Sequence, residues 1–119
     1  KGEHTGTFRG NNLSFIAGEV AIREYWSNNK FSNEIKEKSK IIENFLKQNF
    51  QNIRGYGMIW GIDTDEKTAL KVRNNCFKKG LILELVGSDD NVIKLLPPLT
   101  ITKDELLTGL NILKEAFYE

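Results

Sequence analysis

The residues best suited to chemistry lie near the start of the chain, in the stretch GEHTGTFRGNN at positions 2–12. Gly6 and Thr7 stand a few residues before a predicted helix. Free N–H groups at a helix N-terminus attract anions, and glycine lets a backbone approach a phosphate closely. A threonine hydroxyl adds a further hydrogen-bond donor. The stretch suits phosphate binding, although a plain glycine turn that leads into a capped helix explains the same residues equally well.

Lys94 is the second candidate, because it is the charged residue of the strand-like run Val92-Ile93-Lys94-Leu95-Leu96. The alternating pattern places Lys94 between apolar neighbours, just before Pro97-Pro98, which end the predicted strand. A lysine in this position could face an anionic ligand. A lysine that protects a sheet edge from pairing with other chains is the alternative interpretation.

Other side chains offer little chemistry. His4 is the only histidine, which excludes a histidine-based metal cluster or a Ser-His-Asp relay within this chain, and we interpret it as a loop residue. Cys76 is the only cysteine, and its apolar neighbours at helical spacing predict a buried structural role. Asp89 and Asp90 are predicted turn residues. We therefore expect no metal site.

The composition is that of a globular protein of one domain. The chain has 119 residues, of which 39% are hydrophobic and 28% are charged, and its net charge is +1. This balance gives no electrostatic reason to expect nucleic acid or an anionic membrane as a partner. The apolar runs are far shorter than the roughly 20 residues that cross a bilayer. We expect a cytoplasmic protein without a membrane segment.

The order of predicted elements is α, α, β, α, β, β, α. Asn11 or Asn12 is a suitable N-cap for a first helix that is apolar on two faces, which predicts burial on two sides. Ser32 is the predicted N-cap of the second helix. Thr102 and Glu105 have the spacing of a capping box and predict the start of the last helix.

The β-rich stretches predict the fold class. One covers residues 53–63, and two more, 81–86 and 91–96, are predicted to form a hairpin after a helix at 65–79. The alternation of the two periodicities predicts an α+β fold, a two-layer sandwich with helices on one face of a small, mostly antiparallel sheet of about three strands.

Three motifs resemble class III pyridoxal-phosphate aminotransferases, the group of the ornithine, acetylornithine and 4-aminobutyrate enzymes. GEHTGTFRGNN is similar to the segment after their Schiff-base lysine, IRGYGMIWGID to a strand of their small C-terminal domain, and VIKLLPPLTITKDEL to their final strand and helix. Within the group, GTFRGNN and VGSDDNVIKLLPPLTIT are most similar to diaminobutyrate–2-oxoglutarate aminotransferases, which open ectoine synthesis and supply some siderophore pathways.

The resemblance implies a domain organisation. Residues 1–12 would be the trailing loop of a large cofactor domain that this chain lacks, 13–30 an interdomain helix, and 31–119 the small C-terminal domain. The Schiff-base lysine and most of the phosphate site would lie upstream of Gly2. The resemblance thus implies a pyridoxal phosphate cofactor, a homodimer or higher homo-oligomer, and a segment that has no catalytic residue and is inactive alone.

The resemblance also implies roles for three residues. The threonine matching Thr7 reaches the cofactor phosphate bound to the neighbouring subunit, and Gly6 leaves space for that approach. The position matching Lys94 is usually an arginine that pairs with a substrate carboxylate. Lysine provides a point charge instead of a bidentate fork, which leaves the carboxylate role of Lys94 open.

The implied reaction moves an amino group from glutamate to aspartate 4-semialdehyde and gives 2,4-diaminobutyrate and 2-oxoglutarate. Two alternatives stay open. One is another class III aminotransferase, acting on ornithine, acetylornithine or 4-aminobutyrate. The other is a stand-alone α+β interaction module without a cofactor.

Overall fold

The computed structural model describes residues 6–119, and the chain divides between Glu34 and Ile35 into two compact units. His4, interpreted above as a loop residue, lies outside the described residues. Across the described part, no helix is long and apolar enough to cross a membrane. The elements of each unit are described in turn.

The first unit contains helix α1 (Asn12–Tyr25), which begins where the sequence predicts. The side chain of Asn11 is the N-cap and accepts hydrogen bonds from the N–H groups of Leu13 (2.9 Å) and Ser14 (3.2 Å). The predicted burial on two sides is not found among the described residues, because no residue of α1 is buried. The large apolar side chains that α1 exposes are Leu13, Phe15, Ile16, Val20, Ile22 and Tyr25.

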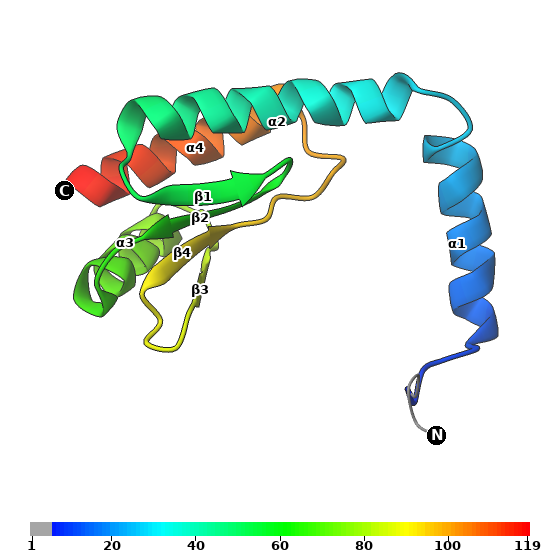
Figure 1. The fold of residues 1–119 in the computed structure, drawn as a ribbon, viewed down its shortest axis with the longest axis horizontal. Coiled ribbons are helices and arrows are strands. Elements are labelled where there is room, and N and C mark those ends of the chain that lie inside the picture. The colour runs from blue at the N-terminus through cyan, green and yellow to red at the C-terminus, as the bar shows by residue number, and fades with distance from the viewer. Residues whose placement is uncertain (1–5) are drawn as a thin grey trace. The chain divides into compact units, whose positions relative to one another are not determined.

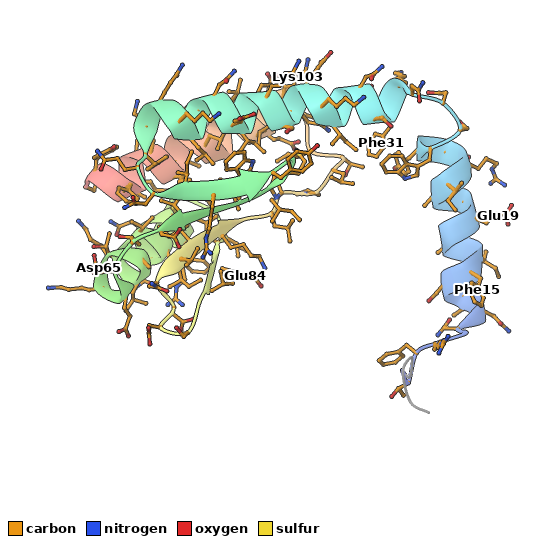
Figure 2. All side chains as sticks on the ribbon, viewed as in Figure 1. Phe15, Glu19, Phe31, Asp65, Glu84 and Lys103 are labelled. Atoms are coloured by element: carbon orange, nitrogen blue, oxygen red, sulfur yellow. The ribbon has the colours of Figure 1, made fainter. Side chains whose placement is uncertain are left out.

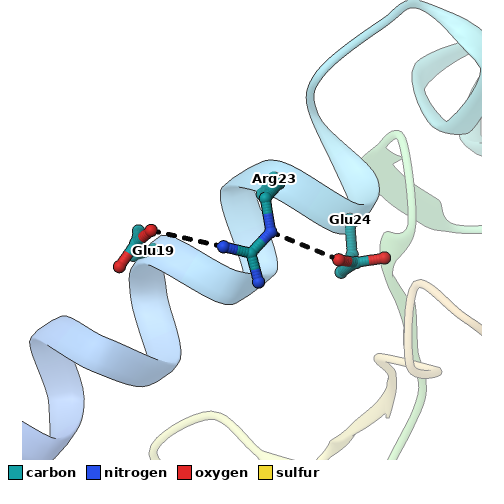
Figure 3. A network of polar contacts seen from close by, with 3 residues as sticks. All are labelled: Glu19, Arg23 and Glu24. Carbon is teal, nitrogen blue, oxygen red and sulfur yellow. Dashed lines mark hydrogen bonds and ion pairs between the residues drawn. The ribbon is translucent and has the colours of Figure 1, made fainter.

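The charged side of α1 carries a short network of ion pairs (Figure 3). Arg23 contacts Glu19 one turn earlier and Glu24 beside it, each at 3.4 Å. All three side chains are well exposed, and exposed pairs of this kind contribute about 0–1 kcal/mol. The network therefore supports the helix only slightly.

Helix α2 (Lys30–Asn49) begins two residues before the predicted cap, so the prediction of Ser32 as N-cap was wrong. The side chain of Asn28 accepts a hydrogen bond from the Lys30 N–H at 2.8 Å, so the helix begins before Ser32. The ring of Phe31 contacts the rings of Tyr25 and Trp26, with centroids 4.9 and 5.2 Å apart. These aromatic contacts hold the turn between α1 and α2.

The second unit contains an antiparallel sheet of four strands in the order β1-β2-β4-β3 (Figure 1). The strands are β1 (Ile53–Tyr56), β2 (Ile59–Asp63), β3 (Glu84–Val86) and β4 (Val92–Leu95). The sequence predicts about three strands, one of them over the β-rich stretch 53–63. It is a hairpin instead, and Gly57 at its turn has a φ of +62°, a conformation that glycine adopts readily.

One face of the sheet is buried, which confirms the predicted α+β sandwich. Trp60 and Ile62 of β2 and Ile93 and Leu95 of β4 belong to the hydrophobic core. Helices α2, α3 (Glu66–Lys78) and α4 (Lys103–Tyr118) all contribute to the same core. Their buried members are Ile42, Leu46, Ala69, Val72, Cys76, Leu106, Leu110, Leu113 and Ala116.

The caps of the last two helices follow the sequence closely. The Asp65 side chain accepts a hydrogen bond from the Thr68 N–H at 2.9 Å and begins α3. The predicted capping box at α4 is confirmed: the Thr102 hydroxyl accepts from the Glu105 N–H at 3.2 Å, and the Glu105 carboxylate accepts from the Thr102 N–H at 3.0 Å. The N-termini of α3 and α4, which follow strands β2 and β4, are thereby fixed by their caps.

Candidate functional site

The second unit presents a row of four residues across the sheet. In the strand register Arg54 lies opposite Gly61, Gly61 opposite Lys94, and Lys94 opposite Glu84. Successive residues of a strand point to opposite faces, and the next row, which contains Ile62 and Ile93, faces the core. The row of four therefore lies on the other side of the sheet, which we call the outer face.

Lys94 and Glu84 form an ion pair on the outer face. The Lys94 Nζ donates a hydrogen bond to Glu84 Oε2 at 2.5 Å, and the side chains are 28% and 70% exposed. Figure 2 labels Glu84 at the sheet, on strand β3. The hydrogen bond from Lys94, and then its charge, hold the pKa of Glu84 below its ordinary value. Glu84 is therefore ionised at neutral pH and stands beside the ammonium group.

Arg54 is the second cation of the row and also has a carboxylate partner. Its guanidinium Nη2 lies 3.0 Å from Asp63 Oδ1. Gly61 separates Arg54 from Lys94, and a Cβ added there would lie only 3.0 Å from Val92 Cγ1. The outer face thus holds two ion pairs on either side of a position without a side chain. Within residues 6–119, no group of three His, Cys, Asp or Glu side chains is placed to hold a metal ion.

A cleft of about 470 Å³ opens beside Lys94 and Glu84. It is bounded by the segment before β3, the end of β4 and helix α4. Its lining is mostly apolar and includes Leu81, Ile82, Leu96, Pro97, Ile101 and Leu106. The volume is within the range of about 300–1,000 Å³ that is usual for small-molecule sites. The sequence-predicted residue Lys94 therefore lies at a cleft that can accept a small ligand.

Gly6 and Thr7 lie in the first unit, exposed in the turn before α1. The Gly6 carbonyl accepts a hydrogen bond from the Arg9 N–H at 3.1 Å, and a side chain added at Gly6 would meet no atom within 4 Å. Asn11 occupies N–H groups at the start of α1, so the helix N-terminus is less available to an anion than the sequence suggested. The exposed Thr7 hydroxyl remains a suitable phosphate donor.

Glu84 and Arg54 are the polar neighbours of the site that sequence reasoning missed. Glu84 could be found only by counting outward from the hairpin loop at 87–91, which places it opposite Lys94. Arg54 and Asp63 are brought together by the β1–β2 hairpin, where the sequence predicts a single β-rich stretch. In both cases the missing information was strand register.

Comparisons with known proteins find several transaminases that are similar to this chain. The chain is 44% identical to a diaminobutyrate–2-oxoglutarate transaminase of Wolinella succinogenes, over 99% of this chain and 29% of that protein. It is also 44% identical to the enzyme of that name from Nocardia farcinica, over 97% of this chain and 28% of that protein. The chain thus spans less than a third of the length of these relatives.

A solved structure has the same fold. The adenosylmethionine-8-amino-7-oxononanoate aminotransferase of Methanocaldococcus jannaschii superposes with a TM-score of 0.75 at 25% identity, over 98% of this chain and 30% of that protein. The family model for class III aminotransferases matches residues 1–117. Nearly the whole chain carries the family's pattern, and it belongs to the class III aminotransferases.

Proposed function

We propose that this chain is the C-terminal part of an aminotransferase that transfers an amino group from glutamate to aspartate 4-semialdehyde, giving 2,4-diaminobutyrate and 2-oxoglutarate. The supporting observation is the 44% identity, over nearly the whole chain, to two transaminases named for diaminobutyrate. Because the chain spans less than a third of their length, the Schiff-base lysine is proposed to lie outside it. The 119 residues alone are expected to be inactive.

Class III aminotransferases use pyridoxal phosphate, which when bound supplies the electron sink for amino transfer. Of the described residues, Thr7 fits a contact with its phosphate, because its hydroxyl is exposed and Gly6 leaves open space beside it. We propose that Thr7 makes this contact with the cofactor held by the neighbouring subunit of a homodimer. The exposed apolar side chains of α1 support a covering partner surface.

Lys94 is proposed to bind a carboxylate of the amino acid substrate. Its ammonium is partly exposed on the outer face and lines the cleft. The side chain is 28% exposed, so a ligand in the cleft can reach the ammonium within the second unit.

The role of Thr7 is tested in the full-length protein with Thr7→Val, which removes the hydroxyl and keeps the shape. A hydrogen bond to a charged group contributes about 1.5–3 kcal/mol, so the dissociation constant for pyridoxal phosphate should rise at least about tenfold. Absorbance titration of cofactor-free protein measures it. Thr100→Val, an exposed threonine of the other unit, is the matched control. Unchanged affinity in Thr7→Val would contradict the role.

The substrate assignment is tested by offering the same protein glutamate, ornithine, acetylornithine and 4-aminobutyrate in competition as amine donors, with aspartate 4-semialdehyde as acceptor. We expect glutamate to be the preferred donor and 2,4-diaminobutyrate to be the product. Preference for another donor would support a different class III activity. The absence of any amino transfer would support an interaction module instead. Light scattering of the purified protein tests the homodimer.

A further inference from the structure

The Lys94–Glu84 pair places a cation and an anion side by side, and amino acids carry the same two charges at one carbon. We propose that this pair binds the zwitterionic end of the substrate, with its α-carboxylate on Lys94 and its α-ammonium on Glu84. The inference rests on the proposed function. In 2,4-diaminobutyrate the reacting amine is at carbon 4, so the α-amino acid end is free to be recognised elsewhere.

The geometry of the pair suits this ligand. Lys94 Nζ and Glu84 Oε2 are 2.5 Å apart and lie on strands paired in register, so the two charges are held next to each other. The ammonium and carboxylate of an amino acid are equally close together. Four groups of alternating charge can then form a ring in which each hydrogen bond is charge-assisted, the stronger kind.

The Glu84 side of the pair is open to a ligand. The Glu84 side chain is 70% exposed and that of Lys94 is 28% exposed, so Glu84 can turn toward a ligand while Lys94 keeps its place on the sheet. The low pKa of Glu84 keeps its carboxylate ionised and able to accept from an ammonium group at neutral pH. A substrate that offers both charges adds two contacts to the one that the pair already makes.

The surroundings leave room for the rest of the substrate. Gly61, the neighbour of Lys94 on β2, has no side chain that would cover the ammonium. The cleft of about 470 Å³ that the pair lines is mostly apolar, and Leu96 at its edge is 53% exposed. The methylene group of a four-carbon amino acid can lie against this surface.

A cation and an anion together can distinguish ligands that one cation alone would bind alike. An isolated lysine would bind the carboxylate of 4-aminobutyrate as well as that of 2,4-diaminobutyrate. Glu84 adds an acceptor that only the α-ammonium of 2,4-diaminobutyrate can use. We therefore infer that Glu84 is a specificity-determining residue and that Lys94 determines carboxylate binding in general.

The test uses the full-length holoenzyme and two substrates that differ only in the α-amino group. In Glu84→Gln the KM for 2,4-diaminobutyrate should rise about tenfold, as expected for loss of about 1.4 kcal/mol of binding, with kcat within about twofold. The KM for 4-aminobutyrate, or its Ki where it is not turned over, should change less than about twofold. Lys94→Gln should raise both values. Glu66→Gln, another exposed glutamate of the second unit, is the control and should change neither.

The possible failures can be told apart. If wild-type protein does not convert 2,4-diaminobutyrate, the proposed function is wrong and this inference falls with it. If wild-type protein converts it but Glu84→Gln affects both substrates equally, or neither, the inference alone is wrong. Glu84→Asp, which keeps the charge, should recover part of the selectivity. If it discriminates no better than Glu84→Gln, a merely structural role is indicated and the inference is overturned.

Discussion

The ammonium group of Lys38 donates a hydrogen bond to the main-chain carbonyl of Leu99, which lies 61 residues later in the chain, at 2.5 Å. It donates another to the carbonyl of Ile101 at 3.1 Å. Lys38 is only 4% exposed. The contact joins helix α2 to the loop that follows Pro97-Pro98, and this loop forms one wall of the cleft beside Lys94.

Replacing Lys38 by methionine should destabilise the chain. The variant keeps most of the side-chain volume, but two loop carbonyls lose their charged donor. A hydrogen bond from a charged donor contributes about 1.5–3 kcal/mol, so its loss should be measurable. Urea unfolding, followed by tryptophan fluorescence, measures the loss. The exposed Lys36 on the same helix provides the control, and Lys36→Met should change stability by less than about 0.5 kcal/mol. Equal stability of the two variants would show that the Lys38 contact contributes nothing.

A side chain at Gly55 should destabilise the fold. It lies opposite Trp60 in the β1–β2 register, and an added Cβ would lie 2.7 Å from Trp60 Cα and 2.6 Å from the indole. The backbone atom cannot move away cheaply, so Gly55→Ala should cost about 1–3 kcal/mol. Gly109→Ala in α4 is the opposite case, because its Cβ would meet only Leu81 Cδ1 at 3.6 Å. Removing a helical glycine should stabilise the chain by up to about 1 kcal/mol. Chemical denaturation of both variants measures the change in the free energy of unfolding, which should be a loss for Gly55→Ala and a gain for Gly109→Ala.

Local chemistry explains what could be predicted from the sequence. The caps at Asn11 and Thr102 depend on residues within one turn of the helix end, and both were found. The burial of Cys76 follows from helical periodicity. The prediction of Ser32 was wrong because the Asn28 side chain, which caps about as well as serine, accepts from the Lys30 N–H and the helix begins there.

Nonlocal pairing explains what could not be predicted. Lys94 was recognisable as a charge within an apolar strand. Its partner Glu84 was not, since a shift of one residue in the β3–β4 register would move every side chain of β3 to the other face. The β1–β2 hairpin could not be predicted for a similar reason, because the stretch 53–63 contains several glycines and only the pairing of its two halves shows that the turn is at Gly57.

The capping box of α4 should contribute to stability in a pH-dependent way. Hydrogen bonds from the Thr102 hydroxyl, and then from its main-chain N–H, lower the pKa of Glu105. A carboxylate whose pKa is lower in the folded state stabilises the fold above its unfolded pKa, and this contribution is lost as the pH falls below it. Thr102→Ala should cost about 1 kcal/mol at neutral pH. The difference between variant and wild type should shrink in acid, and a constant difference would contradict the role of Glu105.

Cys76 should be inert as a thiol and should make stability fall at high pH. It is fully buried, and burial raises its pKa from 9.0 to about 11. In the unfolded chain the thiol ionises first, so its contribution is complete below pH 9 and is lost as the pH rises towards about 11. Iodoacetamide should therefore modify Cys76 at pH 8 only after unfolding.

The variant Cys76→Ala separates the alkaline loss of stability due to the thiol from the loss due to lysines and tyrosines, which also titrate in alkali. The variant should be less stable than wild type at neutral pH, because it leaves a small cavity in the core. It should lose less stability than wild type between pH 9 and about 11, the interval over which the native thiol stays protonated and the unfolded thiol does not. Urea unfolding at pH 7, 9 and 10.5 gives the comparison. Parallel losses in the two proteins, or rapid alkylation of the native thiol, would show that Cys76 is accessible to water in the folded state.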